Sequence, residues 1–348
     1  MNKVYDTIGP KGFGTYEIDW KANTWTRVSA PPKGLLIPGF VDIHIHGGFG
    51  IDFMSASKED MLVLCSKLEK QGYESFLPTT VTASPEAIIQ ALSNLPEHPM
   101  IAGFHLEGPF ISSSYPGAQP QEAIADVPVR KSSWDEILDD PRLKLVTLAP
   151  EKPNALDLIL RLMKRKVTVS MGHTNATYDE ARHGFEFGAH SATHTFNAMR
   201  PLHHREAGTV GYVLNNDAMF AELIYDRHHV CEDAAKLLFK CKPKDKVVAV
   251  SDSTMATGLP PGKKLDMWGL KVVTDTKEVR LGSNGALAGS AITLLDAFRN
   301  LHEDFGAETA IRACCINPRL SLGWKNPPRV FLELDKNLEI VGRREIGS

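Results

Sequence analysis

The sequence contains few of the features that mark a secreted or membrane-bound protein. Its five cysteines are an odd number with no CxxC spacing, so we expect reduced, mostly buried thiols rather than a disulfide framework. No run approaches the ~18 apolar residues that a membrane span requires. The N-terminal segment MNKVYDTIGPKGF also lacks the apolar stretch of a secretion signal. We therefore expect a cytoplasmic protein with no membrane partner.

The sequence also lacks a large excess of charge of one sign and lacks nucleotide-binding motifs. Lys and Arg number 39 against 42 Asp and Glu, which gives a formal net charge of −3, and no block of basic residues is present. Such a chain has no electrostatic footprint for nucleic acid. The sequence has no GxGxxG after a strand, no GxxxxGK[ST] and no GxSxG, so a nucleotide cofactor and a serine-hydrolase elbow have no support. A small molecule is the expected partner.

The sequence does contain short apolar, β-rich segments that alternate with helical patterns from Gly34 onward. This alternation is typical of βα units around a parallel sheet. Capping-box spacing predicts helix starts at Ser57 and Thr177. The expected strands are Leu35–Ile45, Ser75–Val81, Ile101–Leu106, Leu143–Leu148, Val167–Met171, Ala189–Thr195, Met219–Ile224 and Lys246–Val250. Eight is the number of strands that closes an α/β barrel of the TIM type.

The two ends of the chain follow a different pattern from the middle. Residues before Pro38 and after Trp324 alternate apolar and polar side chains, which predicts strands. We expect a (β/α)8 barrel over residues 38–323 and a small β-sandwich domain built from both termini, 1–37 and 324–348. The stretch 257–289 is rich in Gly and Pro and could form a hairpin or an extended excursion before a helix at Ser290–Phe305. Its role is open.

Polar side chains of metal-ligand and proton-transfer types follow the apolar runs. They are His44, His46, Glu107, His173, His194 and Asp252. A buried strand needs only apolar side chains, so the recurrence of these types where each run stops requires a shared cause. Because the carboxyl ends of barrel strands meet at one face, we expect these six side chains to line one cavity, called the cup below, that holds a divalent cation.

Each of these positions has an alternative interpretation. His44 and His46 are two residues apart on a strand, so both point to the same face, but such a pair can also be ordinary polar residues at a strand end. Glu107 could equally be a salt-bridged loop acid. His173 and His194 end successive strands and, with an oxygen of Glu107, make a catalytic metal set, although both could be hydrogen-bonded core histidines.

The number and identity of the ions stay open. Glu107 has two oxygens and could bridge to a second ion held by His44 and His46. Zinc, iron, cobalt and manganese all accept histidine and carboxylate ligands.

Besides the metal ligands, the predicted site has a candidate proton carrier and two candidate phosphate-binding residues. Asp252 follows the last strand, where an acid could take a proton from an activated water and pass it to a leaving group, or could cap the next turn instead. Arg205 and His229 lie beyond the sixth and seventh strands and could hold a phosphate through charge-assisted hydrogen bonds. By spacing alone, exposed surface positions are the commoner outcome for these two.

Taken together, six segments resemble the N-acetylglucosamine-6-phosphate deacetylases of the amidohydrolase superfamily in order and spacing. The segments are PGFVDIHIHGG, HLEGPF, GHTNATY, THTFNAM, VSDST and GALAGSAITLLDAFRN, and the match spans about Pro38 to Gly323. The resemblance implies a metal-dependent barrel with a terminal β-domain, usually a homodimer. It also implies hydrolysis of N-acetyl-D-glucosamine 6-phosphate to D-glucosamine 6-phosphate and acetate in amino-sugar breakdown.

The resemblance implies roles for individual residues. Glu107, His173 and His194 match the family's metal ligands, and Asp252 matches its catalytic acid and base. Other positions match those that hold sugar and phosphate, and Arg205 or His229 is expected to reach a neighbouring subunit's site. The substrate-binding set is Ala118, Gln119, Asn197, Ala198, Arg205, His229, Leu287, Ala288 and Gly289.

The chain departs from some members of the family at two places. Gln119 stands where some members have histidine, and an amide can donate a hydrogen bond but cannot carry a proton, so polarising the acetyl group would depend more on the metal. His44 and His46 are both present, whereas some members have non-ligating residues there, which favours two metals.

Two rival functions deserve comparison with this one. A sister amidohydrolase could cut an N-acyl amino acid or a cyclic amide on the same cup. A non-catalytic sugar-phosphate binder could retain the fold. Such a binder would be expected to lose the acid or a ligand, and this chain has both.

Overall fold

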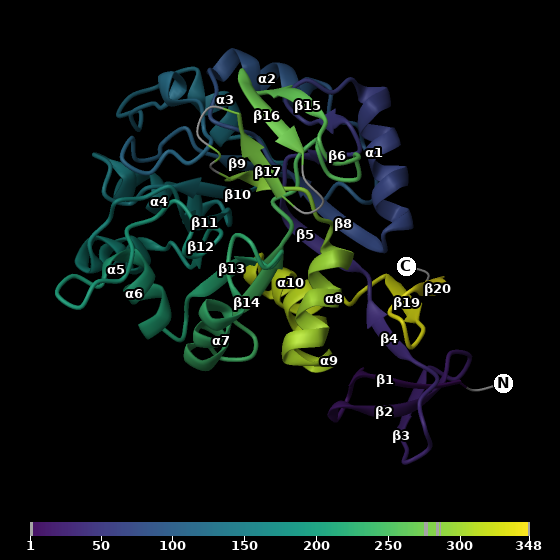
Figure 1. The fold of residues 1–348 in the computed structure, drawn as a ribbon. Helices are drawn as coiled ribbons and strands as arrows, with labels where there is room; N and C mark the ends of the chain where they lie inside the picture. The colour runs from purple at the N-terminus through teal and green to yellow at the C-terminus, as the bar shows by residue number, and fades with distance from the viewer. Residues whose placement is uncertain (1–2, 275–277, 283–284, 286, 347–348) are drawn as a thin grey trace.

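The structure is a computed structural model that describes residues 3–274, 278–282, 285 and 287–346 (Figure 1). The strands are β1 (Lys3–Gly9), β2 (Gly12–Asp19), β3 (Thr24–Arg27), β4 (Leu35–Pro38), β5 (Phe40–Ile45), β6 (Gly47–Gly48), β7 (Ile51–Asp52), β8 (Tyr73–Pro78), β9 (Phe104–Glu107), β10 (Leu143–Leu148), β11 (Thr168–Met171), β12 (Ser191–Ala192), β13 (Phe220–Ile224), β14 (Val247–Val250), β15 (Lys264–Met267), β16 (Leu270–Thr274), β17 (Glu278–Leu281), β18 (Leu287–Ser290), β19 (Val330–Leu334) and β20 (Ile340–Glu345).

The helices that separate these strands match the alternation expected from the sequence. Ser57 and Thr177 both cap helices with the predicted reciprocal hydrogen bonds. The helices are α1 (Lys58–Lys70), α2 (Pro85–Ser93), α3 (Trp134–Leu138), α4 (Ala155–Lys164), α5 (Tyr178–Phe187), α6 (Gly208–Asn215), α7 (Glu232–Cys241), α8 (Leu294–Phe305), α9 (Ala307–Ile311) and α10 (Asn317–Ser321), with a 3₁₀ turn at Gln121–Ala123 and a π-helical segment at Arg312–Ile316.

A curled parallel sheet positions the polar strand ends. Strands β9 to β14 pair in chain order, and β5 pairs with β8, all in parallel. Parallel bridges Phe76↔Ile101 and Thr79↔His105 join β8 to the β9 edge, and Ile45↔Ser253 joins the end of β5 to the segment after β14. The residues of β8, β9 and β14 are buried on both faces, as expected of strands covered by helices.

Several expected strands are shifted by a few residues at their ends, and two differ in more than their ends. The segment Leu35–Ile45 divides into β4 and β5 because Gly39 turns its N–H to the carbonyl of Val330 and approaches Glu74 so closely that an added Cβ would lie 2.7 Å from the Cβ of that residue. The segment Ala189–Thr195 contributes only Ser191–Ala192, since the backbone of His194 turns to a φ of 32°. The first difference depends on contacts with residues distant in the sequence.

The two termini form one sheet, in the order β20-β19-β4-β1-β2-β3. Tyr16, Trp20, Trp25 and Phe331 pack together on it with edge-on or tilted rings. Strands from both termini thus pair in a single sheet, and a sandwich is not confirmed. Residues 1–2 and 347–348 of the expected domain lie outside the described residues.

The described part of the stretch 257–289, whose role the sequence left open, forms an antiparallel sheet with the order β15-β16-β17-β18. It has its own buried cluster, which includes Met267, Val272 and Ala288 and against which Ala118 packs. Ser290 ends β18, so the helix expected from Ser290 begins later, at Leu294, with Thr293 as its cap. Residues 275–277, 283–284 and 286 of this stretch lie outside the described part of the chain.

The cysteines agree with the expectation of mostly buried, unpaired thiols. All five cysteines are free, and Cys65, Cys314 and Cys315 are buried. Across the described ranges we find no helix with the length and apolar character needed to cross a bilayer.

Candidate metal centre

The predicted ligands lie together at the carboxyl ends of the parallel strands. His44 belongs to β5, His46 follows it directly, and Glu107 is the last residue of β9. The other three follow β11, β12 and β14 and have positive φ angles, 47° for His173, 32° for His194 and 47° for Asp252. Non-glycine residues rarely adopt this backbone region, and such strain is most often found at functional sites.

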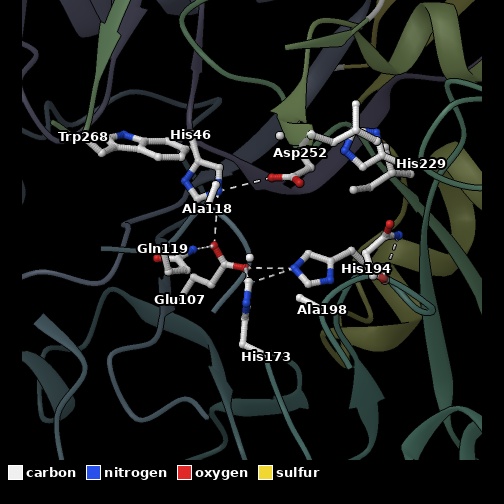
Figure 2. Close-up of a pocket in the computed structure, with 15 residues that line it drawn as sticks. His46, Glu107, Ala118, Gln119, His173, His194, Ala198, His229, Asp252 and Trp268 are labelled. Atoms are coloured by element: carbon white, nitrogen blue, oxygen red, sulfur yellow. Dashed lines mark hydrogen bonds and ion pairs between the residues drawn. The ribbon is translucent and has the colours of Figure 1, made fainter. Parts of the chain in front are cut away.

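Glu107 lies at the centre of the cluster (Figure 2). Its Oε1 lies 3.3 Å from Nε2 of His44, 3.2 Å from Nε2 of His173 and 3.3 Å from Nε2 of His194. Its Oε2 lies 3.2 Å from Nε2 of His46. The carboxylate therefore touches all four imidazoles, and each of the five side chains is buried.

The six predicted residues divide into two sets that could each hold an ion. One set is Glu107, His173 and His194, and the other is His44, His46 and Asp252. Asp252 Oδ1 lies 3.4 Å from Nε2 of His44 and 3.3 Å from Nε2 of His46. Asp252, which the family resemblance implies as the catalytic acid and base, is thus also within reach of a second ion.

The hydrogen-bond chemistry of the imidazoles fits a cation. Nδ1 of His46 lies 3.1 Å from the carbonyl oxygen of Thr79, and Nδ1 of His173 lies 3.0 Å from that of Tyr115. A carbonyl oxygen only accepts, so each Nδ1 carries the proton and each Nε2 presents a lone pair. These lone pairs converge on a carboxylate that also only accepts. A metal ion between them, or protons in its place, would remove the repulsion between these acceptor atoms.

The electrostatics of the cup favour positive charge within it. Burial alone would lower the pKa of His46, but its hydrogen bonds to Asp252 and Glu107 outweigh burial and raise that pKa to about 9. Burial alone would raise the pKa of Glu107, but the charge of His44 and hydrogen bonds from His173 and His194 hold that pKa well below its usual range. The pKa of Asp252 is also lowered against the effect of burial, chiefly by His44 and His46.

A pocket opens from this cluster and contains most of the predicted substrate-binding side chains. Ala118, Gln119, Asn197, Ala198, His229, Leu287 and Gly289 line it together with all the candidate ligands except His44. The amide nitrogen of Gln119 donates to Oε2 of Glu107 over 2.7 Å, and its oxygen accepts from the N–H of Thr82 over 2.7 Å. In this arrangement Gln119 orients a candidate ligand.

The structure does not bring two of the predicted binding residues into the pocket. Ala288 turns its side chain into the cluster under β15–β18, because neighbouring residues on a strand face opposite sides. Arg205 is exposed and lies outside the pocket lining, with Nη1 2.9 Å from Nε2 of His204. His229 does line the pocket, and its Nδ1 lies 2.6 Å from Oδ2 of Asp226.

Sequence reasoning missed three residues beside the site. The ring of His105 packs edge-on against His44 at 4.7 Å between centroids. Glu222 is fully buried in β13, with Oε2 3.5 Å from Nδ1 of His44. A charged residue inside the apolar run FAELI was a signal for Glu222. Trp268 lines the pocket from the β15–β16 turn and had no signal, since the role of its segment was open.

Comparison with known proteins agrees with this geometry. The family model described as "Amidohydrolase family" matches residues 35–327. The chain is 39% identical over 289 residues to an N-acetylglucosamine-6-phosphate deacetylase of Bacillus subtilis, covering 80% of this chain and 72% of the relative. It is 37% identical over 275 residues to the enzyme of that name from Lysinibacillus sphaericus, covering 77% and 70%.

A solved structure also resembles the whole chain. It is a mutant of N-acetyl-D-glucosamine-6-phosphate deacetylase from Mycobacterium smegmatis in complex with N-acetyl-D-glucosamine-6-phosphate. The two superpose with a TM-score of 0.88 at 27% identity, over 99% of this chain and 97% of the other.

Proposed function

The chain belongs to the amidohydrolase family, and we propose that it hydrolyses the acetamide of N-acetyl-D-glucosamine 6-phosphate to D-glucosamine 6-phosphate and acetate. The observation that carries this proposal is the convergence of four imidazoles on Glu107 beside Asp252, in a pocket that His229 also lines. A solved relative is in complex with N-acetyl-D-glucosamine-6-phosphate, which supports the same reaction.

Metal chemistry accounts for the composition of the cup. Glu107, His173 and His194 would hold a divalent ion, which acts as a Lewis acid on the acetyl carbonyl and makes water more acidic. His44, His46 and Asp252 could hold a second ion. We leave zinc, iron, cobalt and manganese as alternatives, which elemental analysis of the purified protein would separate.

The protein's own groups supply the proton transfers. Asp252 is ionised, because its pKa is lowered, and accepts a proton from the attacking water. The water oxygen bonds to the acetyl carbon, the C–N bond breaks, and Asp252 returns the proton to the departing sugar nitrogen. Gln119 holds Glu107 in place through its 2.7 Å hydrogen bond. Binding of the remote phosphate keeps the amide over the reacting groups.

The direct test is acetate release from N-acetylglucosamine 6-phosphate. We expect turnover by the purified protein, loss of turnover after dialysis against a chelator, and recovery on adding a divalent metal salt. The unphosphorylated sugar serves as the matched control and should be a poorer substrate, because it lacks the group that His229 is proposed to bind. Turnover that survives complete metal removal would contradict the proposal.

Phosphate binding should depend on pH through His229. Burial alone would lower the pKa of His229, but its hydrogen bond to Asp226 and the charge of that residue raise it. The imidazole is therefore cationic below its raised pKa and neutral above it, so KM should increase as pH rises through that value. Asp226→Asn should move the increase to lower pH, whereas changing the exposed neighbour, His228→Gln, should not. Identical KM profiles in wild type and Asp226→Asn would contradict this role.

Arg205 bears on the proposed homodimer. Its exposure outside the pocket is compatible with a role in the site of a neighbouring subunit, as the family resemblance implies. Arg205→Ala should raise KM for the phosphorylated sugar by about 10- to 100-fold, the effect of losing a charge-assisted hydrogen bond, and leave chain association unchanged in sedimentation. A KM equal to that of wild type would remove Arg205 from the phosphate site.

We also propose the finer architecture and the location. The bridges that join β8 to β9 and β5 to the end of β14 support a closed (β/α)8 barrel over residues 38–323. The pairing of β4 and β19 supports a terminal β-domain over 1–37 and 324–348. Five free cysteines are compatible with a cytoplasmic protein.

A further inference from the structure

Trp268 has a costly backbone conformation that the fold nevertheless retains. It lies in the turn between β15 and β16 with a φ of 58°, and Gly269 follows at 79°. Two successive residues with positive φ make the tight hairpin turn that normally uses Asn and Gly, and a bulky side chain is rare there. A glycine or asparagine would form this turn with less strain, so the turn alone does not explain a tryptophan.

Two contacts hold the indole in place against the pocket. Its Nε1–H donates to Oδ2 of Asp52 over 2.8 Å. Its ring packs edge-on against the ring of His46, with centroids 5.0 Å apart. Asp52 is itself buried and belongs to β7, directly beyond the first pair of histidines. Trp268 is therefore fixed from two sides and forms part of the pocket wall.

The indole lies at the end of the pocket opposite the proposed phosphate site. Figure 2 shows Trp268 on one side and His229 on the other, with Glu107 and Asp252 between them. In a glucosamine 6-phosphate the phosphate on C6 and the nitrogen on C2 lie on opposite sides of the ring. With the phosphate toward His229 and the amide at Asp252, the acyl chain extends toward Trp268.

We propose that Trp268 is a specificity-determining residue that limits the length of the acyl group to acetyl. The inference depends on the proposed deacetylase function and adds the acyl preference to it. Trp268 and Ala118 both line the pocket and both pack against the apolar cluster under β15–β18, so they supply an apolar wall for the acyl chain. Longer chains must displace a ring that Asp52 and His46 hold in place.

The test compares acyl chain lengths in wild type and in Trp268→Ala. Acetate, propionate and butanoate release are measured from the corresponding N-acyl glucosamine 6-phosphates. The ratio of kcat/KM for butanoyl to that for acetyl should rise at least about tenfold in Trp268→Ala, the usual effect of one or two methylene groups in a hydrophobic pocket. Trp268→Leu should give a smaller rise, and it decides the question if the alanine variant does not fold.

Two measurements separate this role from a structural one. Metal content per chain and the affinity for glucosamine 6-phosphate, which has no acyl group, should equal those of wild type in both variants. Trp25→Leu in the terminal sheet should leave the acyl ratio unchanged. An unchanged ratio in the Trp268 variants, or an equal loss of kcat/KM for all three acyl groups, would overturn the proposal. Failure of wild type to release acetate would instead count against the deacetylase function.

Discussion

Asp252→Asn should reduce kcat for acetate release by about a thousandfold or more, because the step loses both its base and its acid. Asparagine has the size of aspartate but cannot accept the proton from water or return one to the amine. In the folded chain Asp252 is ionised, buried and 3.3 Å from Nε2 of His46. No other side chain of the described cluster has both this position and a negative charge, so none can replace Asp252 as the base. Single-turnover and steady-state rates at neutral pH measure the effect.

The metal content of this variant decides between two explanations of its inactivity. The set of Glu107, His173 and His194 does not include Asp252, so at least one ion per chain should remain. A drop from two ions to one would indicate that Asp252 also serves the second set. Asp245→Asn, at an exposed position shortly before β14, is the matched control and should behave as wild type. Retention of more than a tenth of wild-type kcat would exclude the acid–base role.

Glu107→Ala should remove the ion of the first set and abolish activity. This carboxylate is the shared contact of four imidazoles, so its removal takes away the central oxygen ligand of the first set and the negative charge that favours cations in the cup. We expect kcat/KM to fall by at least about a thousandfold, since metal-ion catalysis supplies several kcal/mol. Inductively coupled plasma mass spectrometry of the purified variant gives the metal content.

The control for this change is Glu122→Ala, an exposed glutamate in the segment that follows the Gln119 turn. It should retain metal and turnover. A Glu107→Ala protein that keeps as many ions per chain as wild type would contradict the proposed assignment of the first set.

The order of the strands and the position of the site could be predicted because they depend on local patterns. Each apolar run that ends in a ligand-type side chain is a contiguous signal, and parallel strands bring such ends to one face. The six candidate residues lie together for this reason, although the first, His44, and the last, Asp252, are more than two hundred positions apart in the sequence.

Other features could not be predicted because distant contacts decide them. The division at Gly39 depends on Val330 and Glu74, which lie far away in the sequence. The sheet β15–β18 is stabilised by a cluster that includes residues from other segments, and its short strands gave only an ambiguous pattern. Which of Arg205 and His229 enters the pocket could not be predicted from a place beyond a strand, since that place does not fix which way a loop turns.

The left-handed backbone at His173, His194 and Asp252 has a consequence for protein engineering. Each of these positions would relax energetically with glycine in place of a side chain that has a Cβ, so a screen for heat resistance alone would reward the loss of the groups that do the chemistry. Thermostable variants of this chain should therefore be sought away from these three turns.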